Sequence, residues 1–405
     1  MRRFAWLLLL LFAFTIPWEF SLNLGETLGH IGRILGVLTI LAAIPAVLQA
    51  GRLRTPGAMQ WLTLVFYLWI CCTYFWTIAP DATLGKMRGS FQEMIVVWLV
   101  WEFAESPRDL RALMCAYVAG SWVLAILTLS DFASAQAIAA NQIRYVSEGQ
   151  DPNDVARFLD MGFPFAALLL ASKPGRTTQL LALGYLPLGL AAVLLTASRE
   201  GFLAAILALA GCACLLARGR GRVVWAGAMG LPAIVAALWI GVPEKTLERL
   251  ATIPEELRRG DLNQRWNIWA AGWHAFARAP FLGSGAGSFV SAAGLNPQDT
   301  AHNTALSILI GGGLCALSLA VAILAVAVRA ALKTRGTLQM TLATVLTVWM
   351  VTSLVATVEE SRTTWLLLAM IALAGRLAVD EPCKLAACFP DLAQKGELEA
   401  AESVL

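Results

Sequence analysis

The chain is predicted to be an all-α polytopic membrane protein, and three observations support this prediction. Of its 405 residues, 58% are hydrophobic and only 14% are charged, and the mean hydropathy is +0.68. Apolar runs of roughly 17–25 residues recur along the chain, and each is long enough to cross a bilayer as a helix. The alternating segments of about ten residues that a membrane-spanning β-barrel requires do not appear in the sequence.

Twelve apolar runs are predicted to form transmembrane helices. The first begins directly after Met1-Arg2-Arg3 and imitates a signal peptide, but Pro17-Trp18-Glu19-Phe20 stands where a small-residue cleavage site would be expected. We therefore expect this run to be kept as the first span. The twelve candidate spans are residues 4–20, 31–50, 59–79, 86–104, 110–130, 155–172, 179–197, 201–217, 223–241, 303–328, 338–358 and 362–379.

One long polar stretch, residues 242–302, separates the ninth candidate span from the tenth. Lys and Arg are concentrated in the short loops on the side of both termini, so the positive-inside rule predicts cytoplasmic termini and an external 242–302 loop. Residues 1–379 then form one transmembrane domain that includes this loop. Residues 380–405 are predicted to be a poorly ordered cytoplasmic tail.

Composition also limits the classes of function. The net charge of +3 is too small to indicate a nucleic-acid-binding surface. None of the eight Cys falls in an external loop, so no disulfide framework is expected. No metal and no cofactor is expected, because no Cys, His or Asp cluster has the spacing of metal ligands. Asp151 and Asp154 are the only remotely suitable pair, and we interpret them as turn and helix-capping residues.

Isolated ionisable residues are costly inside a bilayer, so their placement is informative. In the predicted topology they gather at the external ends of helices, whereas an ion-coupled transporter would more often place them at mid-membrane. The external face is therefore predicted to be the working face of the protein. The residues concerned are Lys86, Arg88, Arg144, Arg157, Arg199, Arg265, His302, Glu359, Glu360 and Arg362.

Within the polar stretch, residues 263–274 have the pattern of an amphipathic helix whose tryptophans suit a membrane interface. The helix is expected to stop at Ala279-Pro280 and to be followed by a tight loop built on three alternating glycines. Arg265 at its start has two interpretations. It is either an interface arginine that snorkels to water or a rigid fork that grips a diphosphate. The loop glycines are Gly283, Gly285 and Gly287.

Two further motifs stand beside predicted helix starts. Ser198-Arg199-Glu200-Gly201 occupies a short external turn, so Arg199 lies at a helix N-terminus, where the backbone favours anions; local pairing with Glu200 is the alternative. His302-Asn303 directly precedes the tenth span. Such a histidine is either a cap or packed polar group, or a residue with a chemical role.

Taken together and in order, the motifs resemble the O-antigen ligase family, which belongs to the O-antigen ligase/polymerase superfamily. The similarity covers about residues 150–320. In one respect the chain departs from the family pattern, because Gly311-Gly312-Gly313 stands where a Glu often precedes the glycine in the helix after His-Asn. The matching motifs are Asp151-Pro152-Asn153-Asp154, Ser198-Arg199-Glu200-Gly201, Arg265-x-x-x-Trp269, Pro280-x-x-Gly283-x-Gly285-x-Gly287-x-Phe289 and His302-Asn303.

The resemblance implies a C-type glycosyltransferase fold and a reaction on the periplasmic face of the bacterial inner membrane. The donor would be O-antigen linked to undecaprenyl diphosphate, the acceptor would be lipid A–core, and both would be held among membrane lipids. Transfer would be metal-independent and would invert the anomeric centre, as a step of lipopolysaccharide biosynthesis. Neither nucleic acid nor a cofactor is implied.

The resemblance also implies roles for individual residues. Arg199 and Arg265 would bind the diphosphate and stabilise the charge that grows on it. His302 would take the acceptor proton as general base. Arg157, Asn303 and Arg362 are further candidates for contacts with phosphate or with core sugars, and no residue is assigned to a metal.

Three alternatives remain open at this point. An O-antigen polymerase or a protein oligosaccharyltransferase of the same superfamily would use the same donor chemistry on another acceptor. A transporter or flippase of polyprenyl-linked sugars would carry polar residues at mid-membrane and a pseudo-repeat, and the sequence has neither. An assembly subunit would leave Arg199, Arg265 and His302 without a role. The ligase is favoured because only a short segment follows the last span.

Overall fold

The prediction of an all-α protein is confirmed by a computed structural model of the chain. Outside helices, the described part contains loops and a single isolated β-bridge between Asn23 and His30, and no strand. The structure describes residues 1–25, 29–137, 142–147, 149–172, 175–217, 241–259 and 265–390.

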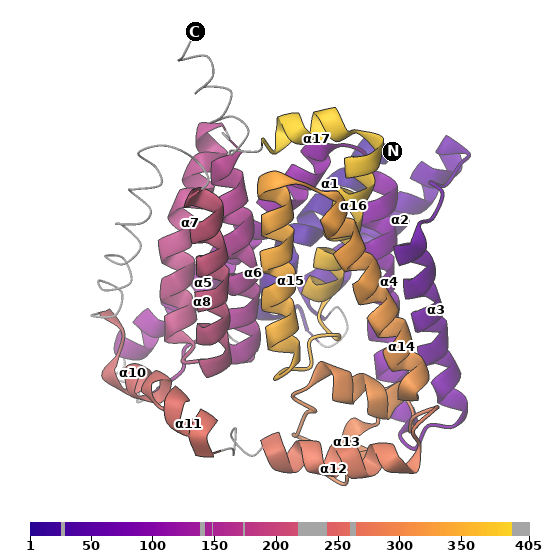
Figure 1. Ribbon diagram of the computed structural model, residues 1–405, viewed down its shortest axis with the longest axis vertical. Helices are drawn as coiled ribbons and strands as arrows, with labels where there is room; N and C mark the ends of the chain where they lie inside the picture. Colours follow the sequence, from indigo (N-terminus) through magenta and orange to yellow (C-terminus); the bar gives the residue numbers. More distant parts are fainter. Residues whose placement is uncertain are drawn as a thin grey trace.

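The helices pack side by side into one bundle, and four short ones gather at one end of it (Figure 1). In chain order they are α1 (Arg2–Thr15), η1 (Ile16–Ser21), α2 (Ile31–Ala50), α3 (Ala58–Cys72), η2 (Thr73–Phe75), α4 (Pro80–Phe103), α5 (Pro107–Ala137), α6 (Pro152–Ala171), α7 (Arg176–Leu195), α8 (Arg199–Ala217), α10 (Glu244–Ala251), α11 (Ile253–Arg259), α12 (Arg265–Arg278), α13 (Phe289–Ala293), α14 (Thr304–Lys333), α15 (Gly336–Ser353), α16 (Arg362–Asp380) and α17 (Pro382–Cys388).

The polytopic character of the chain is confirmed, but the count of twelve spans is not. Eight helical segments of the described part are long and apolar enough to cross a membrane: α1 with η1, α2, α3 with η2, α5, α7, α8, α14 and α16. Helices α4, α6 and α15 run alongside them in the same bundle (Figure 1). The ninth candidate span, 223–241, lies outside the described residues except for its last position.

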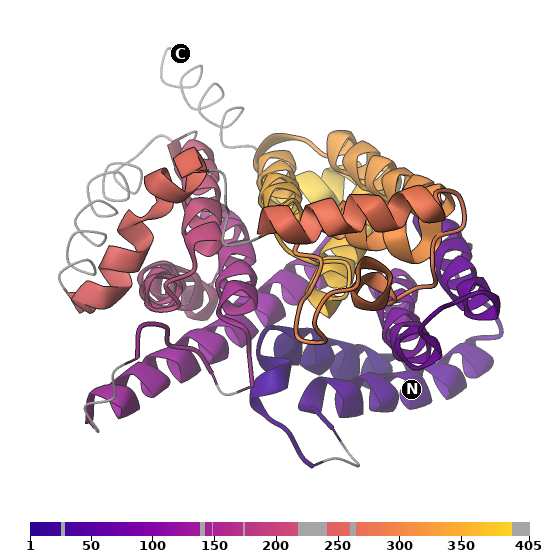
Figure 2. The same ribbon diagram turned by 90° about the horizontal axis from the view of Figure 1, so that it is seen from below.

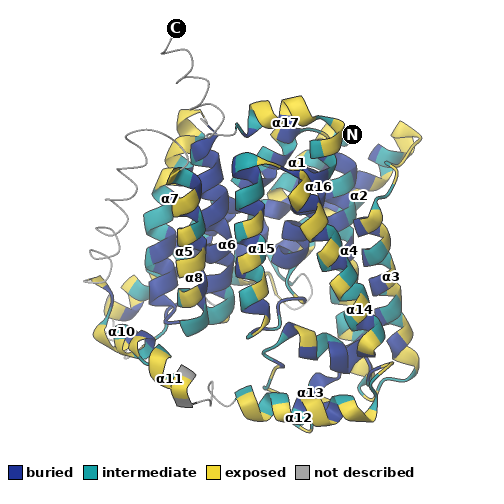
Figure 3. Cartoon of the chain, viewed as in Figure 1, coloured by how far each residue is buried: buried dark blue, intermediate teal, exposed yellow. Residues whose placement is uncertain are grey.

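Helices α6 and α16 form the centre of the bundle. Every residue from 155 to 169 of α6 and from 363 to 375 of α16 is buried, and Figure 3 shows both helices largely in the colour of buried residues. A helix that is covered on all sides needs close neighbours. Small residues allow this close approach. At Gly375 there is no room for a larger residue, because a Cβ added there would lie 2.7 Å from the Cα of Ala330 in α14.

The bundle has two distinct ends. The N-terminus and α17 lie at one end, and α10, α11, α12 and α13 lie at the other, spread across it when the molecule is seen from below (Figures 1 and 2). The segments predicted to be cytoplasmic and the predicted external loop are thus separated by the height of the bundle. Which end faces the periplasm stays a prediction of the positive-inside rule.

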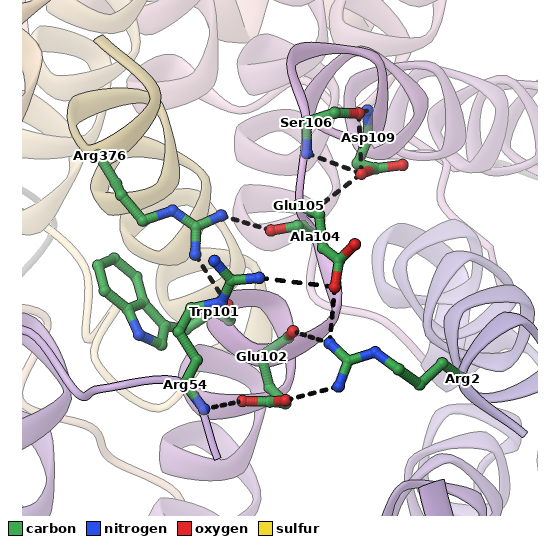
Figure 4. A network of polar contacts seen from close by, with 9 residues as sticks. All are labelled: Arg2, Arg54, Trp101, Glu102, Ala104, Glu105, Ser106, Asp109 and Arg376. Atoms are coloured by element: carbon green, nitrogen blue, oxygen red, sulfur yellow. Dashed lines mark hydrogen bonds and ion pairs between the residues drawn. The ribbon is translucent and has the colours of Figure 1, made fainter. Parts of the chain in front are cut away.

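A polar network holds the helix ends together near the N-terminus (Figure 4). Glu102 at the end of α4 accepts hydrogen bonds from the guanidinium of Arg2 at 2.9 Å and from the backbone N–H of Arg54 at 2.8 Å. Arg376 of α16 stacks over the Trp101 ring, 4.8 Å from its centre, and donates to the Trp101 carbonyl. These contacts join α1, the α2–α3 connection, α4 and α16.

The expectation of a poorly ordered segment from residue 380 onward is wrong for residues 382–390. Helix α17 packs against α5 and α16, with Leu385 and Phe389 buried. Arg111 of α5 stacks over the Phe389 ring and donates a hydrogen bond to the Cys388 carbonyl. These buried apolar side chains and the Arg111 contacts dock the segment on the bundle. The rest of the predicted tail, 391–405, lies outside the described residues.

The tenth predicted span, 303–328, is not one straight helix. Gly313 interrupts α14 with φ 67° and ψ −166°, a conformation that is essentially restricted to glycine. The chain of residues 279–287 lies against the break and satisfies its backbone: Ser284 N–H donates to the Ile310 carbonyl at 2.8 Å, and Leu314 N–H donates to the Pro280 carbonyl at 2.9 Å. Irregular backbone inside an apolar bundle requires partners of this kind.

Candidate functional site

The Ser198-Arg199-Glu200-Gly201 motif forms the tight turn that starts α8. Ala197 before it has a left-handed backbone, with φ 47°. Ser198 Oγ accepts a hydrogen bond from Gly201 N–H at 3.1 Å and donates one to Asn153 Oδ1 at 2.7 Å, which ties the turn to the start of α6. Arg199 is therefore the first residue of α8, where the free N–H groups of the helix favour an anion.

Arg199 reaches from α8 toward α11. Its Nη1 lies 3.0 Å from Thr252 Oγ1 and 2.7 Å from Glu256 Oε1. Local pairing with Glu200 was the alternative interpretation of the motif, but the Glu200 carboxylate pairs with Arg265 instead. The charged residues of the turn thus connect α8 to two different parts of the 242–302 loop.

Arg265 is the first residue of α12 and points inward. Its Nη2 lies 3.1 Å from Glu200 Oε2, and the two side chains are only 16% and 7% exposed. A snorkelling arginine would extend its guanidinium into water, so the ion pair contradicts that interpretation. The second oxygen of Glu200, Oε1, is buried and has no hydrogen-bond partner within the described residues.

The spacing of Arg265-x-x-x-Trp269 has a structural reason. The two side chains lie one turn apart on α12 and share a face of the helix. Arg265 holds Glu200, and Trp269 Nε1 donates a hydrogen bond to the Ala301 carbonyl at 3.1 Å. Helix α12 therefore fixes both the turn before α8 and the residue before His302.

His302 and Asn303 form the sharp entry into α14. His302 has a positive φ of 44°, which is uncommon for a side-chain-bearing residue. Asn303 is the N-cap: its Oδ1 accepts from Leu306 N–H at 2.8 Å, and its Nδ2 donates to the Leu354 carbonyl at 3.0 Å. The cap role is thus established for Asn303, while the His302 imidazole is left to face the space beside it.

That space is a cavity of about 430 Å³ in which the three main predicted residues meet. Arg199 comes from α8, Arg265 from α12 and His302 from the turn before α14, so segments more than a hundred residues apart in the chain contribute to one site. The lining residues are Arg144, Asp151, Asn153, Arg199, Glu200, Leu203, Arg249, Ile253, Glu256, Arg265, His302, Val351, Thr352, Leu354 and Val355.

Sequence reasoning did not assign a site role to two arginines of this cavity. Arg144 donates from Nη2 to Asn153 Oδ1 at 2.9 Å and from Nε to the Thr196 carbonyl at 3.1 Å. Arg249 of α10 donates from Nε to the Ala197 carbonyl at 3.2 Å. In the sequence, Arg144 stands out as an isolated cation near the predicted external end of α6. Arg249 does not stand out, because it lies among the charged residues of α10, which have the pattern of an ordinary solvated helix.

The cavity has more cations than carboxylates, with four arginines against three acids. Burial and the nearby Arg249 lower the pKa of Arg144, and burial and the nearby Arg199 lower the pKa of Arg249. Burial, followed by the charge of Arg265, lowers the pKa of His302 below its usual value. An anion bound here would relieve the repulsion among these cations.

One wall of the cavity is apolar. Val351, Leu354 and Val355 lie at the end of α15, and Leu203 lies on α8 across from them. Leu354 and Leu203 are exposed large hydrophobic side chains. The site therefore combines a cationic interior with an apolar side, which suits a charged group attached to a hydrocarbon chain.

The remaining predicted residues lie elsewhere. Arg157 is buried in α6 and pairs with Asp154 at 2.6 Å without lining the cavity. Arg362, at the start of α16, lines a second cavity, where it contacts Glu19 and Gln92. The interpretation of Asp151 as a helix cap is confirmed, because its side chain accepts from Asn153 N–H at 2.8 Å.

Comparison with known families found one match in the same region. A family model described as O-antigen ligase matches residues 184–321. The matched segment holds the turn before α8, all of α12, the glycine loop and the first part of α14, which include Arg199, Arg265 and His302. The match supports the O-antigen ligase/polymerase superfamily. Comparison with curated proteins gave no match.

Proposed function

We propose that this member of the O-antigen ligase/polymerase superfamily is an O-antigen ligase. It would transfer a polysaccharide from undecaprenyl diphosphate to lipid A–core on the periplasmic face of the bacterial inner membrane. The observation that carries the proposal is the convergence of Arg199, Arg265 and His302 on one cationic cavity. These are the residues to which the sequence resemblance assigns the chemistry, and they come from three separate segments.

The arginines of the cavity are the proposed holders of the donor diphosphate. A guanidinium offers several N–H donors in a planar fork, which matches the oxygens of a phosphate group. Arg265 and Arg199 are each held by a carboxylate, so their positions are set before the donor arrives. Positioned cations of this kind stabilise the charge that appears on a leaving group in the transition state.

His302 is the proposed general base. Because burial and Arg265 lower its pKa, the imidazole is neutral at neutral pH and can accept a proton. Its backbone is fixed on both sides, by the Trp269 hydrogen bond to the Ala301 carbonyl and by the Asn303 cap. The ring therefore has a defined place beside the arginines.

The proposed reaction is a single displacement. The acceptor hydroxyl oxygen attacks the anomeric carbon of the donor sugar and forms the new glycosidic bond. The bond between that carbon and the diphosphate oxygen breaks, and undecaprenyl diphosphate leaves with both electrons of the bond. The acceptor proton moves to His302. Attack opposite the leaving group inverts the anomeric centre.

The apolar wall is the proposed contact for the start of the polyprenyl chain. Leu203, Val351 and Leu354 offer hydrocarbon next to the arginines, so the diphosphate and the first isoprene units can be bound at the same place. This arrangement favours a lipid-linked donor over a soluble nucleotide sugar. The acceptor is not constrained by this wall.

The experiment that tests the proposal identifies the product. Purified protein in liposomes is supplied with polyprenyl-diphosphate-linked glycan, with or without lipid A–core, and the products are separated by size. We expect glycan attached to lipid A–core only when that acceptor is present. Lengthened glycan still attached to the polyprenyl diphosphate would instead show a polymerase, and unchanged donor in every mixture would contradict a transferase function.

A further inference from the structure

A second cavity of about 350 Å³ lies at the same end of the bundle as the arginine cavity. It is formed where η1 meets the start of α2, the middle of α4 and the start of α16. Exposed residues such as Asn23 and Arg33 belong to its walls, so it opens to the surface. The function proposed above does not use this cavity.

Most of its charged groups are already paired. Arg362 contacts Glu19 and the Gln92 side chain. Glu360 lies 2.8 Å from the Lys86 ammonium, which also lies 3.6 Å from Glu359. These ion pairs fix the walls of the cavity from three separate helices.

Glu93 is the buried exception, because Arg33, the other charged lining residue without an ion pair in the described part of the chain, is exposed. It lines the cavity from α4 and is only 4% exposed, yet its carboxylate has no hydrogen bond or ion pair within the described residues. The charges of Lys86 and Arg362 act on this group only from beyond ion-pair distance, so its oxygens keep unused hydrogen-bonding capacity at the cavity wall. A ligand that donates hydrogen bonds to Glu93 would supply the missing partner.

The lining selects the class of ligand. Three carboxylates, Glu19, Glu93 and Glu360, face two arginines, so a phosphate is disfavoured here in comparison with the arginine cavity. A neutral sugar fits better. Each of its hydroxyl groups can donate a hydrogen bond to a carboxylate, which only accepts, and can accept one from an arginine, which only donates.

An aromatic ring stands at the rim of the cavity. Phe20 is 39% exposed and meets the His30 ring edge to face, with the ring centres 5.0 Å apart. The exposed face of such a ring offers apolar contact area beside polar groups. The C–H face of a pyranose ring is the matching surface on a saccharide.

The segment between α15 and α16 connects this cavity to the arginine cavity. Leu354 and Val355 line the arginine cavity, and Glu360, a few residues later, lines the second one. The same segment is bonded to the first turns of α14 next to His302: Ser307 Oγ donates to Glu359 at 2.6 Å, and Thr304 Oγ1 donates to the Ala356 carbonyl at 2.8 Å. One short segment, residues 354–360, thus contributes to both cavities, although no described residue lines both of them.

We propose that the second cavity is a binding subsite for the acceptor saccharide, with Glu93 as a specificity-determining residue that accepts hydrogen bonds from sugar hydroxyls. The inference rests on the proposed transferase function. It separates the two substrates: the donor diphosphate is held by the arginine cavity, and a neutral sugar of the acceptor is held by the second cavity, which the 354–360 segment links to the first.

The test measures the two substrates separately. Transfer in liposomes is followed against acceptor concentration at saturating donor, and against donor concentration at saturating acceptor, for the unmodified protein, Glu93→Gln and Phe20→Ala. Asp81→Asn is the matched control, because it removes one exposed carboxylate near the start of the same helix and lines neither cavity. Binding of lipid-free core oligosaccharide to each protein is measured in parallel, without donor.

We expect Glu93→Gln to raise the acceptor KM by roughly tenfold, because the amide replaces one acceptor oxygen by an N–H donor, with the donor KM unchanged. Phe20→Ala should shift the acceptor KM in the same direction, and Asp81→Asn should shift neither KM. An unchanged acceptor KM and unchanged oligosaccharide binding in both variants would overturn the subsite, as would a rise in the donor KM alone. Absence of transfer by the unmodified protein would instead contradict the proposed function.

Discussion

Gly313→Ala is expected to disrupt the structure that positions His302. The new Cβ would lie 2.1 Å from the Phe281 carbonyl oxygen and 2.3 Å from its carbon. Ordinary van der Waals contact lies at 3.4–4 Å, so the carbonyl oxygen would have to move by about 1.3 Å to reach it. The obstacle is backbone, which cannot rotate away as a side chain can. The substitution must therefore either move the 279–287 loop or change the break in α14.

The size of the effect follows from two contributions. An alanine held in this glycine-only region costs about 1–3 kcal/mol. Moving the loop also breaks the hydrogen bonds from Ser284 N–H to the Ile310 carbonyl and from Leu314 N–H to the Pro280 carbonyl, each worth roughly 1 kcal/mol. The sum is roughly 3–5 kcal/mol. At about 2 °C per kcal/mol for long chains, the melting temperature should fall by at least roughly 5 °C.

The assay is thermal unfolding of the purified protein in detergent, together with transfer activity below the transition. Gly85→Ala is the control, because a Cβ at Gly85 in α4 would meet nothing within 4 Å and alanine is the better helix former. We expect Gly85→Ala to keep or slightly raise the melting temperature. A Gly313→Ala protein that melts within about a degree of the unmodified one and transfers normally would refute the argument that the break must hold this geometry.

Three further predictions concern the arginine cavity. Because burial and Arg265 lower the pKa of His302, its neutral form should persist below pH 6.5. Transfer should therefore decline only as the pH falls through that lowered pKa. A decline in transfer that begins well above pH 7 would contradict the assignment of His302 as the base. His302→Ala should reduce kcat by at least ~10²-fold at neutral pH, and a loss of only a few fold would make it an orienting residue. Glu200→Ala removes the carboxylate that holds Arg265, so kcat should fall by roughly tenfold or more while the protein still inserts; full activity would show that Arg265 needs no such support.

The fold class could be predicted from the sequence because hydrophobicity alone decides whether a segment dissolves in lipid. The same property does not show which helices lie at the centre. Helix α6 carries Arg157 and Asp160 yet is covered on every side, and its position depends on contacts with α5, α7 and α8 that no local pattern reveals. The count of twelve spans was not confirmed, because α4, α6 and α15 are not among the eight segments long and apolar enough to cross a membrane, and the candidate at 223–241 lies largely outside the described residues.

The sequence motifs predicted those residues of the candidate site that lie at helix starts. Arg199, Arg265 and Asn303 each stand at a helix start, and helix starts have sequence signals. Arg249 was missed because its role depends on the approach of α10 to the turn before α8, which is a tertiary contact. The position of Arg362 in a different cavity could not be predicted for the same reason, because it depends on a tertiary contact with Glu19, which lies more than three hundred residues earlier in the chain.

The break in α14 could not be predicted from its glycines alone. Three consecutive glycines are compatible with a continuous membrane helix as well as with a turn. What decides between them is the 279–287 loop, whose backbone groups pair with Ile310, Gly311 and Leu314. The sequence signal for the break is divided between two glycine clusters about thirty residues apart. The conformation of each cluster has a reason only once the two are known to be in contact.

The central claim is that the arginine cavity performs the transfer, and Arg265→Ala tests it most directly. The variant is compared with the unmodified protein and with Arg258→Ala, which removes an exposed arginine of α11 that does not line the cavity. Transfer from polyprenyl-diphosphate-linked glycan to lipid A–core should fall by at least ~10²-fold for Arg265→Ala and stay near normal for Arg258→Ala, with equal amounts of each protein in the membrane. Equal transfer by all three proteins would place the chemistry outside this cavity.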